Sequence, residues 1–254
     1  MAAEPIRIYA IRQFEIDVLI PLTAFGYDVS FTVSSQAMLT TVILVSAYLV
    51  WATQKLTFVP GRLQMSAELV HTFVEDTLVR FGGPEARQTL PFFLTIFVFL
   101  LFGSLIGLTP VKFTFTSHLI VTFGLALTVF IYINILAFRT QGWAFFRFFL
   151  PSGTPLYLAP LMVVIELVSY LFRPVTLGMR IFANIVSGHI MLKLFGDFCA
   201  MLTENFGAAG IAMSVLPLAA AVLMHFVEVG VYLIQSYIFI VISAIYVRDA
   251  LHSH

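Results

Sequence analysis

Long apolar runs with few or no charges limit how this chain can fold more than any other feature. Three of them, at about 37–58, 90–109 and 117–138, approach the ~20 residues that a helix needs to cross a bilayer. Two longer stretches, at about 176–203 and 211–252, exceed a perpendicular span and are interpreted as tilted or partly interfacial helices. Only 10% of the residues are charged, against about 25% in soluble domains. The sequence therefore predicts an all-α polytopic membrane protein with about five to six hydrophobic helices.

We expect a single membrane domain over residues 1–254, without internal repeats or low-complexity tracts. The N-terminal segment, 1–35, carries several charges and is expected to lie outside the bilayer. The first three spans occupy 37–138. A proline-rich segment then leads into a helix that carries Glu166 and is expected to break at Arg173–Pro174.

Residues 62–81 form a different kind of helix. Small or apolar side chains recur there at helical spacing, namely Leu63, Ala67, Val70, Val74, Thr77 and Leu78. The charged or polar residues Glu68, His71, Glu75 and Asp76 lie elsewhere on the wheel. This pattern predicts an amphipathic helix at the membrane interface. A helix packed on the protein's own surface would show the same pattern, so both interpretations stay open.

Lys and Arg residues are unevenly distributed among the loops. The 55–89 loop holds four of them and the 139–147 loop two, whereas the loop between the second and third spans holds only Lys112. Positive residues concentrate on the cytoplasmic side of membrane proteins. We therefore expect the 55–89 loop, the 139–147 loop and the C-terminus on the cytoplasmic or matrix side, and the N-terminus outside. Arg7 and Arg12 run against this orientation.

Several function classes are excluded by composition and motifs. The net charge is zero and no basic tract is present, so nucleic-acid binding has no support. A nucleotide site is not expected, because the sequence has neither a glycine-rich phosphate loop nor a nucleophile elbow. The single cysteine, Cys199, excludes an internal disulfide, and no His or Cys spacing suits a metal. We expect no cofactor.

Arg180 is a permanent positive charge inside an apolar helix. A guanidinium at bilayer depth costs from about 3 to more than 10 kcal/mol, depending on the reference state. Arginine does not give up its proton to avoid that cost. We therefore expect Arg180 to be functional, with a structural ion pair to Glu166 or Glu228 as the alternative.

The helix that carries Arg180 has two polar faces. Each residue advances about 100° around a helix. Near the Arg180 stripe lie Arg173, Thr176, Asn184 and Ser187. His189 follows Arg180 by nine positions and points about 180° away. Because polar groups that face lipid are penalised, two polar faces indicate two polar surroundings.

The last apolar stretch carries polar groups on one stripe. Glu228 and Gln235 are seven residues apart, so two helical turns bring them to the same face, together with His225 and Tyr232. A carboxyl at this depth, like that of Glu166, is expected to be paired or protonated. Interhelical hydrogen bonds or packing are the alternative for these residues and for those around Arg180. Together the polar groups indicate ion or proton translocation.

One long motif covers much of the second half of the chain. It consists of Glu166, the run Arg173–Pro174–Val175–Thr176–Leu177–Gly178–Met179–Arg180–Ile181–Phe182–Ala183–Asn184, then Gly188–His189, and finally Glu228 and Gln235. This motif closely resembles subunit a of F-type ATP synthases. The similarity covers most of the chain, including the sequence Gly107–Leu108–Thr109–Pro110 after the second span. The His-then-Glu order is similar to that of mitochondrial and α-proteobacterial members.

The resemblance implies a proton-translocating stator subunit, surrounded by membrane lipid, that is not an enzyme on its own. Residues 151–252 would form the proton-channel helices and end in a long tilted hairpin packed against a ring of c subunits. Two aqueous half-channels would reach this ring, and Arg180 would separate them while facing the rotor carboxylate. The partners would include the peripheral stalk b-type subunits. The expected location is the bacterial cell inner membrane, or the mitochondrial inner membrane.

The resemblance also implies roles for other residues. Asn184 and Gln235 match polar residues near the essential arginine. His189 and Glu228 match a pair that lines a proton-access path, and Glu166 matches an acid linked to the opposite-side path. Further candidates are His225, Tyr232, Arg173 and Ser187.

The second span departs from the family at two positions. Ser104 stands where many relatives have Asn, and Gly107 replaces an acid found in some, so the resemblance assigns no role to this span. Two rival functions are a secondary proton-coupled transporter, which would show internal repeats, and a structural subunit whose buried charges pair only with each other.

Overall fold

The computed structural model is that of an all-α membrane protein, as the sequence predicts. The structure describes residues 18–21, 23–24, 27–28, 30–54, 57, 59–108, 114–143, 145 and 157–251. The helices are α1 (Val33–Thr53), α2 (Arg62–Gly82), α3 (Leu90–Gly107), α4 (Leu119–Gln141) and α5 (Ala159–Leu251), with short 3₁₀ helices η2 (Pro84–Thr89) and η3 (Phe115–Ser117). Several sequence predictions lie outside the described residues, namely those on Arg7, Arg12, Lys55, Lys112, Arg147 and the start of the 151–252 region.

Four helical segments are long and apolar enough to cross a membrane: α1, α3 with η2, α4 and α5. The predicted spans at 90–109 and 117–138 correspond to α3 and α4 within a few residues. α1 begins four residues before the predicted start at 37, because Thr32 caps it by accepting a hydrogen bond from the Ser35 backbone N–H at 3.4 Å. Hydropathy measures apolar content and carries no information on capping.

Two short antiparallel ladders precede α1, and the sequence analysis did not predict them. The strands are β1 (Val18–Ile20), β2 (Thr23–Ala24), β3 (Tyr27–Asp28) and β4 (Phe31–Thr32), paired as β1 with β4 and β2 with β3. Strands of two or three residues are too short for a periodicity signal.

α2 is the predicted amphipathic helix, and the second half of its apolar stripe packs on the protein itself. Val74 and Leu78 have no exposed surface. The ring centroid of Phe73 lies 5.6 Å from that of Tyr237 on α5 and 5.8 Å from that of Phe97 on α3. The first half exposes the large apolar side chains Leu63, Met65 and Leu69. Packing on the protein surface is therefore confirmed for the second half, and an interfacial position stays a prediction for the first.

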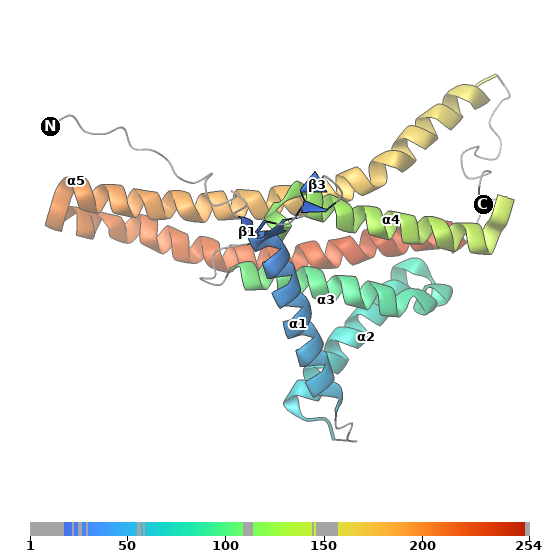
Figure 1. Ribbon diagram of the computed structural model, residues 1–254, viewed down its shortest axis with the longest axis horizontal. Coiled ribbons are helices and arrows are strands. Elements are labelled where there is room, and N and C mark those ends of the chain that lie inside the picture. Colours follow the sequence, from blue (N-terminus) through green and yellow to red (C-terminus); the bar gives the residue numbers. More distant parts are fainter. Residues whose placement is uncertain are drawn as a thin grey trace.

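α5 is a hairpin of two long arms, 159–206 and 208–251. Gly207 between them has φ +53° and ψ −125°, a backbone conformation that residues with a Cβ rarely adopt. Figure 1 shows the two arms side by side, with the tip of the hairpin reaching beyond the other labelled helices. The predicted C-terminal helical hairpin is confirmed, and its tilt in the membrane stays a prediction.

The predicted helix break at Arg173–Pro174 is wrong. α5 continues through Pro174, which is buried inside the helix. A proline removes one backbone hydrogen bond and presses against the preceding turn, so a helix held on both sides bends at that point instead of ending. Figure 1 shows the first stretch of α5 leaving the line of the hairpin at an angle.

The first arm of α5 packs closely on α4. A Cβ atom added at Gly178 would lie 3.0 Å from the Cα atom of Phe123, so the missing side chain lets the two helix backbones approach.

The end of the second arm is also joined to α4. The side chains of Thr140 and Gln141 at the end of α4 donate hydrogen bonds to the Ala250 carbonyl oxygen at 3.2 and 2.6 Å. These bonds satisfy a carbonyl that the last turn of α5 would leave free.

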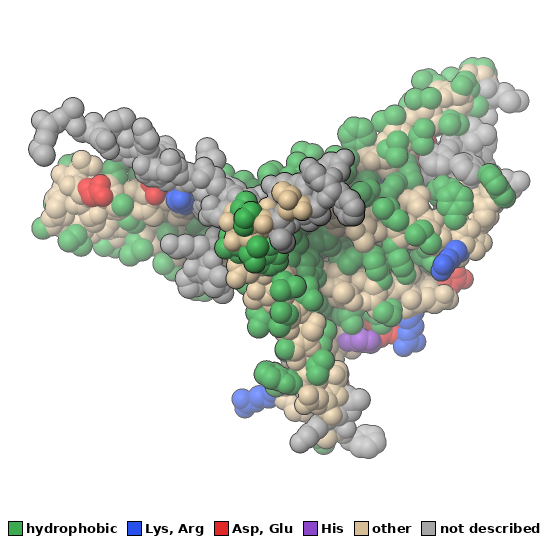
Figure 2. All heavy atoms as spheres, in the orientation of Figure 1, with side chains coloured by type: hydrophobic (Ala, Val, Ile, Leu, Met, Phe, Trp, Pro, Cys, Tyr) green, Lys and Arg blue, Asp and Glu red, His purple; other side chains and the backbone are tan. Residues whose placement is uncertain are grey.

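The surface of the molecule is largely apolar. Figure 2 shows hydrophobic side chains spread along the visible helices, with charged side chains at only a few places. Large exposed apolar residues lie on both arms of the hairpin, including Met191, Leu216, Leu223 and Phe226. Apolar areas of this extent suit helices that face lipid or other membrane subunits.

Candidate functional site

Three predicted site residues from the two arms of α5 meet in one buried cluster. The Tyr232 hydroxyl donates a hydrogen bond to Glu228 Oε1 at 2.5 Å. His189 Nδ1 lies 3.9 Å from the same oxygen, and the Tyr232 hydroxyl oxygen lies 3.4 Å from His189 Nε2. Glu228 and Tyr232 are 2% and 1% exposed. The cluster therefore groups a carboxyl, a phenol and an imidazole, which can all donate or accept protons.

The space for the Glu228 carboxyl is created by a glycine on the facing arm. A Cβ atom at Gly188 would lie only 2.6 Å from Glu228 Oε1. The second carboxyl oxygen, Oε2, has no hydrogen-bond partner among the described residues. Because an unpartnered buried oxygen is costly when it is charged, this oxygen is suited to carry a proton.

Thr114 completes the cluster, and the sequence analysis missed it. Its Oγ1 lies 2.9 Å from His189 Nε2, and the residue is 5% exposed. A Cβ atom at Gly107 would overlap the Thr114 side chain, so the end of α3 also shapes the cluster. The second span, to which the resemblance assigned no role, thus borders the site. The hydroxyl-rich run at 114–117, beside an apolar span, was the available sequence signal.

Arg180 lies on the other face of the first arm. Its side chain is exposed, whereas His189 points to the second arm, so the predicted two-faced helix is confirmed. Within the described part of the chain, Arg180 forms no ion pair with Glu166 or Glu228. The structural ion pair considered as an alternative is therefore not formed between these residues.

Asn184 and Gln235 link the two arms one turn beyond Arg180. Asn184 Nδ2 donates a hydrogen bond to Gln235 Oε1 at 2.8 Å, and Gln235 is 6% exposed. Gln235 and Ser104 both line a cavity of about 10 Å³, close to the minimum volume for one water molecule. The interhelical hydrogen bond that the sequence offered as one role for this pair is thus present.

Arg173 joins the first arm to the end of the second arm. Its guanidinium lies 3.6 Å from the Asp249 carboxylate. The guanidinium carbon also lies 4.9 Å from the ring centroid of Tyr170 and 4.5 Å from that of Tyr246. An ion pair combined with two cation–π contacts holds these segments together. These partners lie outside the Glu228 cluster.

The remaining predicted residues are not brought into the cluster by hydrogen bonds. Glu166 is half-buried and His225 is exposed, and neither has a hydrogen bond or ion pair among the described residues. The Ser187 hydroxyl donates to the Asn184 backbone carbonyl at 3.0 Å. The described part of the chain also holds no group of three or more His, Cys, Asp or Glu suited to a metal ion.

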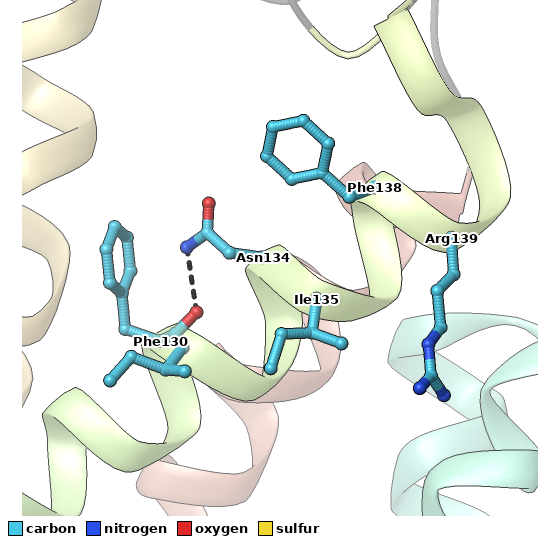
Figure 3. Close-up of a pocket in the computed structure, with 6 residues that line it drawn as sticks. Phe130, Asn134, Ile135, Phe138 and Arg139 are labelled. Atoms are coloured by element: carbon cyan, nitrogen blue, oxygen red, sulfur yellow. Dashed lines mark hydrogen bonds between the residues drawn. The ribbon is translucent and has the colours of Figure 1, made fainter.

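An open groove of about 500 Å³ runs along α4, shown in Figure 3. It is lined by Phe130, Ile131, Asn134, Ile135, Phe138 and Arg139. Both polar atoms of the Asn134 side chain are already hydrogen-bonded within the protein. Nδ2 donates to the Phe130 carbonyl at 2.8 Å, and Oδ1 accepts from the Tyr170 hydroxyl at 2.9 Å. None of the predicted site residues lines this groove, and its apolar wall suits contact with lipid.

Comparison with known proteins identifies a family that covers most of the chain. The model of the family described as ATP synthase A chain matches residues 35–248. The chain belongs to the ATP synthase A chain family. A protein named ATP synthase subunit a from Mesorhizobium japonicum is 41% identical over 252 residues, which cover 99% of each chain. A protein of the same name from Rhodospirillum rubrum is 41% identical over 244 residues, 96% of this chain and 98% of the relative.

Membership in the ATP synthase A chain family defines the function class. The chain is a proton-translocating, non-catalytic membrane subunit of the Fo sector, and it is part of a multi-subunit complex. The resemblance seen in the Arg180 motif is confirmed. The rival function of a secondary proton-coupled transporter is not supported.

Proposed function

We propose that this subunit guides protons through two aqueous half-channels that meet at Arg180, and that Arg180 faces a ring of c subunits. The two-faced first arm of α5 is the observation that supports this most. Arg180 is exposed and lacks an ion-pair partner among the described residues, whereas His189 points to the buried Glu228. Because an intramembrane charge needs a counter-charge, we expect that of Arg180 on another subunit.

A fixed charge on this face acts on a passing rotor carboxyl. At a separation of about 4 Å and an effective dielectric near 20, the guanidinium favours the ionised carboxylate by about 4 kcal/mol. The rotor carboxyl therefore releases its proton beside Arg180 and takes up another before it returns to lipid. Arginine keeps its own proton and repels one that approaches between the half-channels. A proton leaking past it would waste about 2.3 kcal/mol per 100 mV of membrane potential.

We assign one proton-access path to the cluster of Glu228, His189 and Tyr232. Their distances of 2.5 to 3.9 Å support stepwise proton exchange with small movements of the side chains. Glu166 is assigned to the path on the opposite side, since it is half-buried in the first arm on the other side of Arg180 along the helix.

The other predicted residues receive supporting roles. The hydrogen bond from Asn184 to Gln235 keeps the two arms in register. His225 and Ser187 are further candidates for the lining of the proton path. Arg173, which is engaged by Asp249, holds the ends of the arms together.

We infer that the complex lies in a bacterial cell inner membrane, since the similar proteins named above come from bacteria. The distribution of Lys and Arg supports an outside N-terminus and a cytoplasmic C-terminus. The peripheral stalk b-type subunits are expected to contact this chain away from the Arg180 face.

A cysteine on the Arg180 face should crosslink to the c subunits. Ala183 is exposed and lies less than one helical turn from Arg180. We expect Ala183→Cys, in a Cys199→Ser background and carrying a short photo-crosslinker, to yield a product that mass spectrometry identifies as this chain joined to a c subunit. Leu127→Cys, on an exposed part of α4, is the control. A c-subunit product from Leu127→Cys alone would contradict the proposed face.

Gly188→Ala should slow proton-driven ATP synthesis about tenfold, because the added Cβ would lie 2.6 Å from Glu228 Oε1 and displace the carboxyl. Gly196→Ala is a matched control on the same arm, since a Cβ there meets no atom within 4 Å. The measurement is the initial rate of synthesis by reconstituted vesicles under an imposed proton gradient. Equal rates for the two variants would mean that the position of the Glu228 carboxyl has no effect on proton flow.

A further inference from the structure

We propose that Thr114 is a positioning residue, which holds the His189 ring in the orientation that lets it exchange a proton with Glu228. This inference rests on the proposed role of His189 and Glu228 in a proton-access path. Thr114 comes from the segment just before η3, far from α5 in the sequence. Its contact therefore adds a third element of the chain to a site that the two arms of α5 otherwise form alone.

The two nitrogens of the His189 ring face different partners. Nε2 lies 2.9 Å from Thr114 Oγ1, a normal hydrogen-bond distance, and Nδ1 lies 3.9 Å from Glu228 Oε1. The Tyr232 hydroxyl is farther from Nε2, at 3.4 Å, and is already engaged by Glu228. Thr114 is therefore the closest hydrogen-bond partner of the ring, and this bond keeps Nδ1 directed at the carboxyl.

The surroundings of Thr114 are shaped to keep its hydroxyl in place. The Thr114 backbone carbonyl accepts hydrogen bonds from Ser117, at 2.6 Å from the hydroxyl and 3.0 Å from the backbone N–H. Gly107 at the end of α3 provides the space for the side chain, because a Cβ atom there would overlap it. Gly107 thus makes room for a threonine inserted into the site.

A hydroxyl is suited to this position because its oxygen can accept a hydrogen bond from the ring. When His189 is neutral with its proton on Nε2, the ring donates to Thr114 Oγ1, and Nδ1 is free to take a proton from the Glu228 carboxyl. When Nδ1 takes that proton, Nε2 still donates to Thr114 Oγ1. The proton passes between Nδ1 and Glu228 Oε1, while Thr114 neither gains nor loses a proton.

The ionisable groups in contact with His189 are Glu228 and Tyr232 of the second arm. Three more lie near in the elements around it: Lys193 one turn after His189 on the same arm, the exposed His225 one turn before Glu228, and His118 just after η3. The segment before η3 presents Thr114, and the end of α3 presents Gly107. Neither of these residues titrates, so a change at Thr114 acts on the pH response through His189.

The test compares Thr114→Val, which removes the hydroxyl and keeps the branched shape, with Thr114→Ser, which keeps the hydroxyl. Thr116→Val is the matched control, because Thr116 is fully buried two residues away and its Oγ1 has no partner among the described residues. Reconstituted vesicles with the assembled complex are assayed for ATP synthesis as the pH on the proton-entry side is varied.

We expect Thr114→Val to slow synthesis about tenfold and to move the half-maximal rate to lower pH. The reason is that a hydrogen bond to the charged ring is stronger than one to the neutral ring, so the protonated state of His189 loses more. Thr114→Ser should stay close to wild type. Gly107→Ala, which pushes on Thr114 from α3, should shift the pH profile in the same direction as Thr114→Val.

Two outcomes would overturn the inference. One is a wild-type rate and pH profile for Thr114→Val, and the other is an equal loss in Thr114→Val and Thr116→Val without any pH shift. An inactive Arg180→Ala complex measured in the same vesicles would show that the proposed function stands in spite of such a result. Normal synthesis by Arg180→Ala would instead contradict the proposed function itself.

Discussion

Replacing Arg180 by alanine should abolish proton-driven ATP synthesis while the complex still assembles. The variant loses the interaction of about 4 kcal/mol that favours the ionised rotor carboxylate, and this corresponds to about a thousandfold in rate. Assembly should persist, because Arg180 is exposed and has no ion-pair partner among the described residues of this chain. The measurement is ATP synthesis by reconstituted vesicles, normalised to the amount of ATP-hydrolysing sector bound to the membrane.

The Arg180→Ala complex should also leak protons, because the repelling charge between the half-channels is gone. Dissipation of an imposed pH gradient measures this leak. Arg248→Ala is the matched control, since Arg248 is an exposed arginine on the other arm of the same hairpin. Synthesis at the wild-type rate by an assembled Arg180→Ala complex would refute the proposed role of the arginine.

Glu228→Gln should slow proton uptake by at least about tenfold, within the usual range for losing a proton-transfer group. The glutamine keeps the size of the side chain and an oxygen that accepts the Tyr232 hydrogen bond, which is 2.5 Å long in the native protein. It cannot bind and release a proton in the physiological range. The structure should therefore stay intact while one step of the proposed path is lost.

The pH dependence of pumping in vesicles is the readout for Glu228→Gln. Glu204→Gln makes the same chemical change at an exposed position near the hairpin tip and is expected to behave as wild type. If Glu228→Gln pumps with an unchanged rate and pH dependence, the buried carboxyl is structural, and the path must use other groups.

Much of the architecture could be predicted because it depends on local properties of the chain. Apolar runs of span length predicted α3 and α4 closely, and the amphipathic spacing at 62–81 predicted α2. The prediction at Pro174 failed, because propensity describes an isolated helix, whereas Tyr170 before the proline and Gly178 after it both contact α4. The start of α1 was missed for a similar reason, since a cap depends on the geometry of one side chain.

Hydropathy along the whole chain determined the membrane class, and the residues of α5 alone determined the arginine within an apolar helix and the opposite directions of Arg180 and His189. These properties follow from hydropathy and from the advance of about 100° per residue, which needs no other part of the chain. The partners of His189 required the folded molecule. Thr114 lies 75 residues away in the sequence and meets the ring only after α3, η3 and the hairpin have packed together. Contacts of that separation depend on how helix faces dock, and no periodicity along the chain encodes them.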